Sequence, residues 1–192
     1  HILKLRKLKE LDKNGKLVER GNMEYIQTMQ SPLGKLTASS DGDNITWLWF
    51  ENQKYYAATL EKENEVHDLL VFQLVKKWLD LYFAESKPDF SIPVAPKGSP
   101  FRQAVWKILR TIPYGEIVTY GDIVKQLKET QGMNTSARAV GGAVGHNPIS
   151  ILIPCHRVIG AKGKLTGYAG GIDKKVQLLK LEHVSPEKLC MS

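Results

Sequence analysis

The sequence predicts an α+β protein of two parts, a small antiparallel sheet with one helix followed by a mostly helical C-terminal part. Two observations predict this fold. Short apolar runs separated by turn residues occupy 24–50, and helical patterns occupy 66–83 and most of the chain after residue 99. With 192 residues, the chain has room for one medium domain or two small ones.

The predicted strands lie at 24–30, 35–39 and 45–50. The segments between them, 31–34 and 41–44, are rich in Gly, Pro, Asp and Asn, the residues that favour tight turns. Strands joined by such short turns are neighbours in a sheet. We therefore expect a small antiparallel sheet at the start of the fold.

A long amphipathic helix is predicted from 66 to 83. Its apolar residues return at helical intervals through Leu70, Leu74, Trp78 and Tyr82. We expect this stripe to cover one face of the sheet, with its aromatic side chains in the core.

A proline-rich stretch from 86 to 100 separates the two parts. It holds four prolines and no helical periodicity, which is typical of an extended linker. We therefore predict an N-terminal domain at 23–85, a linker at 86–99 and a C-terminal domain at 100–192.

The net charge of +7 favours encounter with polyanions, and nucleic acid is the leading candidate partner. Seven Lys and Arg lie in residues 1–22, which we interpret as a tag or mobile arm, with Met23 as the native start.

No apolar run is long enough for a membrane span and no secretory signal is recognisable, so a cytoplasmic protein is expected. With two cysteines, Cys155 and Cys190, neither a disulfide nor a metal site is predicted.

Three helices are predicted in the first half of the C-terminal domain. Ser99 caps the first, which ends at 113–115, and Thr119 caps the second, which is short and ends in a polar turn at 128–134. The third runs from 136 to about 145. The last two are compatible with a helix-turn-helix, although many helical hairpins bind no DNA.

The third helix carries Gly141 and Gly142 in its interior, each of which costs roughly 1 kcal/mol relative to alanine. Two explanations are equally open. The glycines allow close packing of another helix, or, with Ala137 and Ala139, they let the helix approach a phosphate backbone or a narrow groove.

A short buried strand is expected at 151–154, directly before Cys155. A glycine-rich loop at 160–171 and a final helix at 173–183 follow.

Cys155 is followed by His156, a residue able to take its proton. A thiol attacks as a thiolate, and an imidazole lowers its pKa below the free value of about 8.5. Neighbours on an extended chain point to opposite sides, so the proton must pass through a bound water or a local bend. Glu182, on the final helix, is the candidate carboxylate that orients the imidazole.

The segment Ile151-Leu152-Ile153-Pro154-Cys155-His156-Arg157-Val158-Ile159 resembles the active-site signature of the O6-alkylguanine-DNA alkyltransferases, the methylated-DNA–protein-cysteine methyltransferases. The resemblance is dense over 99–183 and weaker over 23–83. It implies a ribonuclease H-like N-terminal domain and a C-terminal domain with a helix-turn-helix. The family's order is also followed at 101–120, 136–148, 167–171 and 178–182.

The activity implied by this resemblance is direct-reversal DNA repair. An alkyl group moves from O6-alkylguanine, and from O4-alkylthymine, in double-stranded DNA to Cys155 after nucleotide flipping. Each molecule acts once, as a monomer and without a cofactor. The alternative is an alkyltransferase-like protein that binds the lesion without reacting, but such proteins lack the cysteine. A Cys-His hydrolase and a transcription regulator are less favoured.

The resemblance also assigns roles to individual residues. His156 is the water-mediated base, Asn147 the hinge asparagine, and Arg138 the side chain that fills the space left by the flipped nucleotide. The implied catalytic residues are Cys155, His156, Glu182, Asn147 and Tyr120. The implied DNA-binding residues are Ser136, Ala137, Arg138, Gly141, Tyr120, Gly121 and Ala161. The implied pocket residues are Ser150, Val158, Tyr168, Ala169 and Gly170.

Three features depart from the family's pattern. The polar turn at 128–134 is longer than the usual helix-turn-helix connection. Ser150 stands where some members carry a proline against bulky alkyl groups. The zinc ligands of some animal members are absent from the sequence.

Overall fold

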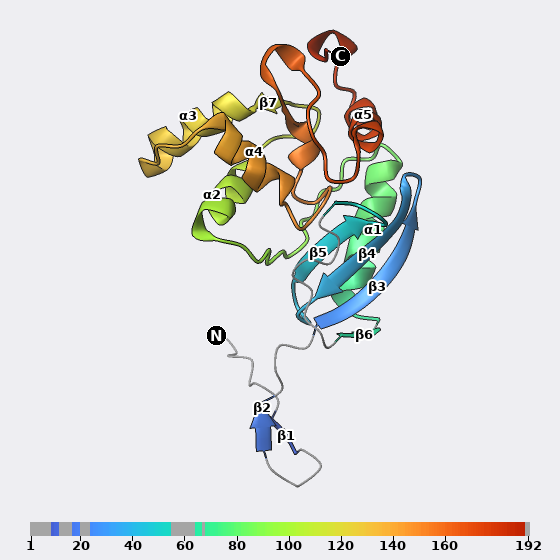
Figure 1. Cartoon of the computed structure of the whole chain (residues 1–192). Coiled ribbons are helices and arrows are strands. Elements are labelled where there is room, and N and C mark those ends of the chain that lie inside the picture. Colours follow the sequence, from blue (N-terminus) through green and yellow to red (C-terminus); the bar gives the residue numbers. More distant parts are fainter. Residues whose placement is uncertain (1–8, 12–16, 20–23, 55–63, 67, 191–192) are drawn as a thin grey trace.

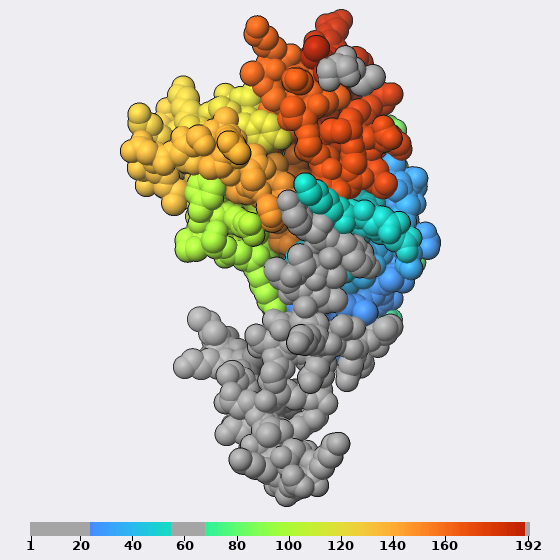
Figure 2. Space-filling model, viewed as in Figure 1, coloured from blue at the N-terminus to red at the C-terminus, as the bar shows by residue number. Residues whose placement is uncertain are grey.

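The computed structural model describes residues 9–11, 17–19, 24–54, 64–66 and 68–190. A sheet with one helix on its face forms one half of the molecule, and a group of helices forms the other (Figure 1). In the space-filling view, the residues after 100 sit directly against this sheet half (Figure 2). The α+β fold in two parts is confirmed.

Strands β3 (Glu24–Ser31), β4 (Gly34–Ser40) and β5 (Ile45–Phe50) form an antiparallel meander with the two expected turns. A short strand, β6 (Asn64–Val66), pairs with β3 in parallel, so the sheet order is β5-β4-β3-β6. Every residue of β5 is buried, which places this edge strand inside the protein.

Helix α1 (Leu70–Phe83) packs against the sheet (Figure 1). It starts later than predicted, because residues 64–66 belong to β6. The predicted stripe was wrong in part, since Leu70 is 72% exposed. Two sets of residues share helical spacing here, and periodicity alone does not separate them. The buried set is Val71, Phe72, Val75, Leu79 and Tyr82.

The free edge of β5 is covered by two segments from later in the chain. Ile45 forms a parallel bridge with Val94 of the proline-rich linker, and Leu48 forms one with Ile149. The backbone N–H of Ser150 donates to the carbonyl of Leu48 at 2.7 Å. The linker is extended, but it is bound along the sheet, and one hydrophobic core continues from the sheet into the C-terminal helices.

The C-terminal part contains α2 (Pro100–Leu109), α3 (Tyr120–Gln131), α4 (Ala137–Gly145) and α5 (Ile172–Leu181). The predicted N-caps at Ser99 and Thr119 are confirmed, since each hydroxyl accepts from a backbone N–H in the first turn of α2 and α3. Ser136 caps α4 in the same way. The hairpin of α3 and α4 packs on α2, where Trp106 Nε1 donates to the carbonyl of Ala143 at 2.8 Å.

The predicted turn at 128–134 was placed too early. Helix α3 continues to Gln131 and ends at Gly132, whose φ of 64° is left-handed. Polar residues on the exposed side of a helix resemble a turn in sequence, and here they continue the helix. The connection to α4 is therefore residues 132–136, which is shorter than the sequence indicated.

The strand predicted at 151–154 was also wrong. Residues 150–152 form a turn, with Ile151 at a φ of 69°, and residues 155–157 form the short 3-10 helix η1 (Cys155–Arg157). The apolar run reflects burial in the core and not an extended backbone. A two-residue parallel ladder between β7 (Val118–Thr119) and β8 (Val158–Ile159) then joins the chain after η1 to the start of α3.

In the segment 1–22, the structure describes a short antiparallel pair, β1 (Lys9–Leu11) with β2 (Leu17–Glu19). The remainder of that segment, with Met23, lies outside the described residues. Of the helices described, none combines the length and the apolar character needed to cross a membrane.

Gly115→Ala should destabilise the protein more than Gly132→Ala. Both glycines have positive φ, 78° and 64°, so either alanine incurs backbone strain of about 1–2 kcal/mol. A Cβ at Gly115 would also lie 2.9 Å from the carbonyl oxygen of Glu182, whereas a Cβ at Gly132 has nothing within 4 Å. Urea unfolding of both variants measures the difference, and equal losses would contradict the crowding at Gly115.

Candidate active site

Cys155 lies in the first position of η1, between the segment bound to β5 and the strand β8. Its side chain is buried, with 5% exposed. The chain turns here, so Cys155 and His156 are not neighbours on an extended strand.

The centre of the site is the buried carboxylate of Glu182, at the C-cap of α5. His156 Nε2 lies 2.7 Å from its Oε1, and the hydroxyl of Tyr82 donates to the same oxygen at 2.7 Å. Arg157 donates through Nε to Oε2 at 2.7 Å and through Nη2 to Oε1 at 2.9 Å. The backbone N–H of Gly115 completes the set, 3.1 Å from Oε2. Four separate segments of the chain meet at this carboxylate.

Glu182 stays ionised in this setting. Burial alone would raise its pKa, but the hydrogen bonds of His156 and Arg157, together with the charge of Arg157, outweigh burial and hold the pKa well below its ordinary range. An ionised carboxylate only accepts hydrogen bonds, so His156 Nε2 must carry the proton. This partner assigns the tautomer and leaves the lone pair on Nδ1.

His156 is prepared to act as a base. Burial lowers its pKa, with the charge of Glu182 opposing that change, so the ring is neutral near pH 7. Within the described part of the chain, Nδ1 is buried and has no hydrogen-bond partner. The ring is thus held at one nitrogen and free to accept a proton at the other.

The thiol of Cys155 is held between opposing influences. Its pKa is raised above the ordinary value by burial, and a hydrogen bond from Asn147 and the charge of Lys175 offset only part of that rise, so the lowering that was expected from the imidazole is not found. The Asn147 amide also donates to the carbonyl of Ile153 at 2.8 Å, and its Oδ1 accepts from the N–H of Ile149 at 3.0 Å. Asn147 therefore joins the end of α4 to the segment that carries the thiol.

Lys175 was not expected at this site. Its side chain is fully buried in α5, and Nζ donates to the carbonyls of Val158 at 2.6 Å and Thr166 at 2.8 Å. Burial lowers its pKa to about 8, so it is mostly protonated at pH 7. Its spacing from the buried Leu178 and Leu179, on the apolar side of the helix, was the signal available in the sequence.

Two tyrosines lie near the sulfur. Burial raises the pKa of both Tyr120 and Tyr168, and the negative charge of Cys155 raises it further. The hydroxyl of Thr166 donates to that of Tyr120 at 3.3 Å. Gly170 packs against the second tyrosine, because a Cβ there would lie 2.9 Å from the Tyr168 ring.

The turn after β5, in the N-terminal half, contacts two of the residues that were expected to line the pocket, Ser150 and Ala169. The hydroxyl of Ser150 donates to Gln53 Oε1 at 3.2 Å, and the N–H of Lys54 donates to the carbonyl of Ala169 at 3.0 Å. Gln53 also accepts from the N–H of Phe50 at 2.9 Å. No pattern in the sequence indicates this contact, because it joins residues about a hundred positions apart.

The residues assigned to DNA binding lie on α4 and around it. Ser136, Ala137 and Arg138 are exposed at the start of α4, and Gly121 and Ala161 are exposed on neighbouring segments. The explanation of the two glycines by close packing is not supported. A Cβ at Gly141 would make only an ordinary contact of 3.7 Å with Tyr120, and one at Gly142 would meet nothing within 4 Å.

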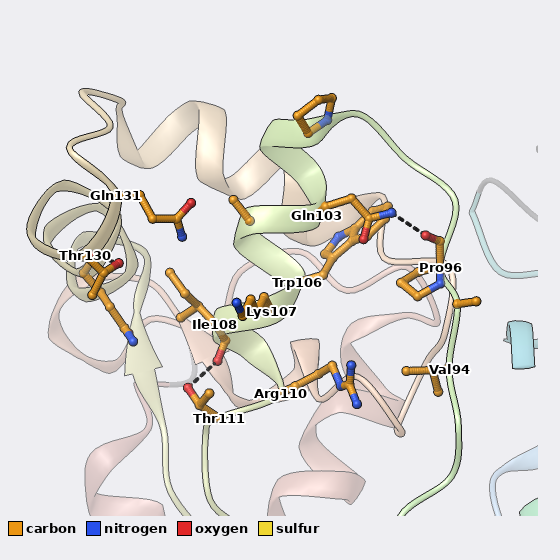
Figure 3. Close-up of a pocket in the computed structure, with 14 residues that line it drawn as sticks. Val94, Pro96, Gln103, Trp106, Lys107, Ile108, Arg110, Thr111, Thr130 and Gln131 are labelled. Carbon is orange, nitrogen blue, oxygen red and sulfur yellow. Dashed lines mark hydrogen bonds between the residues drawn. The ribbon is translucent and has the colours of Figure 1, made fainter. Parts of the chain in front are cut away.

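A cavity of about 990 Å³, separate from the reactive residues, lies between the linker, α2 and the end of α3 (Figure 3). Val94, Gln103, Lys107 and Thr130 are among its lining residues, and none of the reactive residues is. In the described ranges, no three His, Cys, Asp or Glu side chains are grouped to hold a metal ion.

Two family models match most of the chain. The 6-O-methylguanine DNA methyltransferase DNA binding domain matches residues 100–184, and the ribonuclease-like domain of the same family matches residues 25–96.

Individual proteins agree with this match. A methylated-DNA–protein-cysteine methyltransferase of Haemophilus influenzae is 44% identical over 161 residues, or 83% of this chain and 87% of the relative. One from Methanosarcina acetivorans is 42% identical over 163 residues, or 82% and 97%. The crystal structure of Mycobacterium tuberculosis OGT in complex with DNA superposes with a TM-score of 0.73 at 44% identity, covering 82% of this chain and 92% of that chain.

Lys175→Gln should raise the pKa of the Cys155 thiol, because it removes the positive charge that favours the thiolate. Titration of the thiolate by its ultraviolet absorbance, in a Cys190→Ser background, measures the change. Lys180→Gln is the matched control, since Lys180 is exposed on the same helix. A Lys175 variant that folds with an unchanged thiol pKa would show that this ammonium has a structural role alone.

Proposed function

Since the chain belongs to the 6-O-methylguanine DNA methyltransferase family, we propose that Cys155 is the residue that takes the alkyl group from O6-alkylguanine in duplex DNA. The activity is direct-reversal repair by a methylated-DNA–protein-cysteine methyltransferase. One observation carries the assignment of Cys155: the adjacent imidazole is held at Nε2 by an ionised carboxylate and keeps Nδ1 free.

The reaction is one displacement at carbon. The thiol of Cys155 gives its proton to His156 Nδ1, through a water molecule or after a small ring movement, and Glu182 stabilises the imidazolium. The thiolate then attacks the alkyl carbon, so that a C–S bond forms and the bond from carbon to O6 breaks. Guanine leaves restored, and the hydroxyl of Tyr120 offsets the negative charge of the departing purine. Cys155 ends as a thioether that no step cleaves, so each molecule reacts once.

The lesion must leave the base stack to reach a buried thiol. Arg138 is exposed near the start of α4, where it can fill the space of the flipped nucleotide. Small residues around it permit α4 to approach the minor groove, since Ala137 carries only a methyl group and Gly142 has no side chain.

The division into 23–85, 86–99 and 100–192 is part of the same proposal. The C-terminal domain carries the DNA-facing helices and the thiol, and the N-terminal domain supports the pocket through Gln53 and the backbone of Lys54. A cytoplasmic location agrees with the state of the two cysteines. Cys155 and Cys190 are both free thiols, and thiols stay reduced in that compartment.

An alkyltransferase-like protein that only binds the lesion is the second candidate. Such a protein has no use for a thiol with a base prepared beside it. Because Cys155 is present with its imidazole and carboxylate, transfer is favoured over binding alone.

Incubation with a duplex containing O6-methylguanine should add one methyl group per molecule, measured by intact mass spectrometry. Cys155→Ser should abolish the increment, because the alcohol is a far weaker nucleophile at neutral pH. Cys190→Ser is the matched control and should keep full stoichiometry, since Cys190 is exposed and is not one of the residues assigned to the reaction. A methyl group found on Cys190, or none on the wild type, would overturn the assignment.

Arg138→Ala should slow transfer from duplex DNA about tenfold or more, a loss of roughly 1.4 kcal/mol of transition-state stabilisation. Its reaction with a free O6-alkylguanine base should be unchanged, because that substrate needs no flipping. Arg110→Ala removes an equally exposed charge from the end of α2 and controls for general attraction to DNA. Equal losses in the two variants on duplex DNA would refute a specific role in flipping.

A further inference from the structure

We propose that Tyr82, which α1 of the N-terminal half supplies, is a positioning residue for alkyl transfer: its hydroxyl fixes the carboxylate that holds His156. This inference rests on the proposed function, since it names a further residue of the same site. Tyr82 is 100 positions from Glu182 in sequence and donates to its Oε1 at 2.7 Å.

The hydroxyl of Tyr82 has a task separate from the packing of its ring. The ring stacks on Trp78 at 5.2 Å between centroids and meets Tyr114 edge-on at 6.1 Å. Tyr82 is fully buried, and phenylalanine would fill the same space. A buried hydroxyl is costly unless it is bonded, so its presence is explained by the oxygen that it reaches.

The direction of this hydrogen bond is fixed. Glu182 is ionised and only accepts, while burial and the nearby carboxylate raise the pKa of Tyr82 far above its usual range. Tyr82 therefore donates at every pH at which the protein works. A donor bonded to an ionised oxygen is among the stronger hydrogen bonds in proteins. The stacked ring holds the donor still, so the carboxylate is held still as well.

The same bond sets how strongly Glu182 holds a protonated His156. Oε1 accepts from three donors, those of Tyr82, His156 and Arg157. When one donor is removed, the oxygen is more negative and stabilises the imidazolium more. The base then becomes protonated at a higher pH, where it can no longer take the proton of the thiol.

The other groups around His156 do not reproduce this effect. Lys175, on α5, and Arg157, in η1, both disfavour the imidazolium through their charge, and Cys155 lies beside the ring in the chain. Tyr114, in the loop after α2, faces Glu182 but donates to the carbonyl of Leu181 at 2.9 Å. Tyr82 differs from these groups because it is neutral, comes from the sheet half and donates directly to the Glu182 carboxylate.

The test is the pH profile of single-turnover methyl transfer with the full-length protein in excess over a methylated duplex. In Tyr82→Phe, the acid limb should move to higher pH by about half a unit to one unit, and the plateau rate should fall. Tyr114→Phe is the matched control, because it removes a neighbouring hydroxyl that does not touch the carboxylate. Its acid limb should stay in place.

A second variant separates positioning from stability. In this variant, fluorotyrosine replaces Tyr82 and no other tyrosine, which keeps the ring and makes the hydroxyl a stronger donor. The acid limb of its pH profile should move to lower pH, opposite to that of Tyr82→Phe. An acid limb that stays in place in both Tyr82 variants, while the wild type transfers methyl normally, overturns the inference. Absence of transfer in the wild type would instead overturn the proposed function.

Discussion

One buried carboxylate organises this molecule. Removing an ionised Glu182 from water is expensive, and the cost is met only if donors surround it. They come from α1, the loop at Gly115 and η1, and they meet the carboxylate at the C-cap of α5. Because the donors are far apart in sequence, none of these segments can shift without breaking a charged hydrogen bond. The carboxylate thus specifies one arrangement of the fold, and it holds a neutral imidazole at the residue that follows the thiol in the chain.

The edge of β5 also helps to place the thiol, because it binds the segment that precedes Cys155. A sheet edge offers unpaired N–H and C=O groups, and here Leu48 bonds to the chain just before the reactive turn. That contact and the Asn147 amide hold residues 147–153 without helix or ladder. Cys155, which follows this segment in η1, is therefore attached both to the sheet and to the end of α4.

Local chemistry in the sequence was sufficient to predict the strands at 24–50 and the caps at Ser99 and Thr119, because these depend on residues within a few positions. The grouping of Cys155 with His156 came from adjacency. The polar partners Tyr82 and Lys175 and the turn at 150–152 could not be predicted in this way. Their roles depend on contacts across many tens of residues, and an apolar periodicity reports that a position is buried without reporting what it meets.

The composition of α4 bears on which DNA this protein can serve. Specific readers of sequence carry side chains that match donors and acceptors on base edges. The exposed start of α4 offers alanine, glycine and a single guanidinium at Arg138, so it has little with which to tell one run of bases from another. Under the proposed function, such a surface suits surveillance of an entire genome, in which discrimination is left to the residues around Cys155.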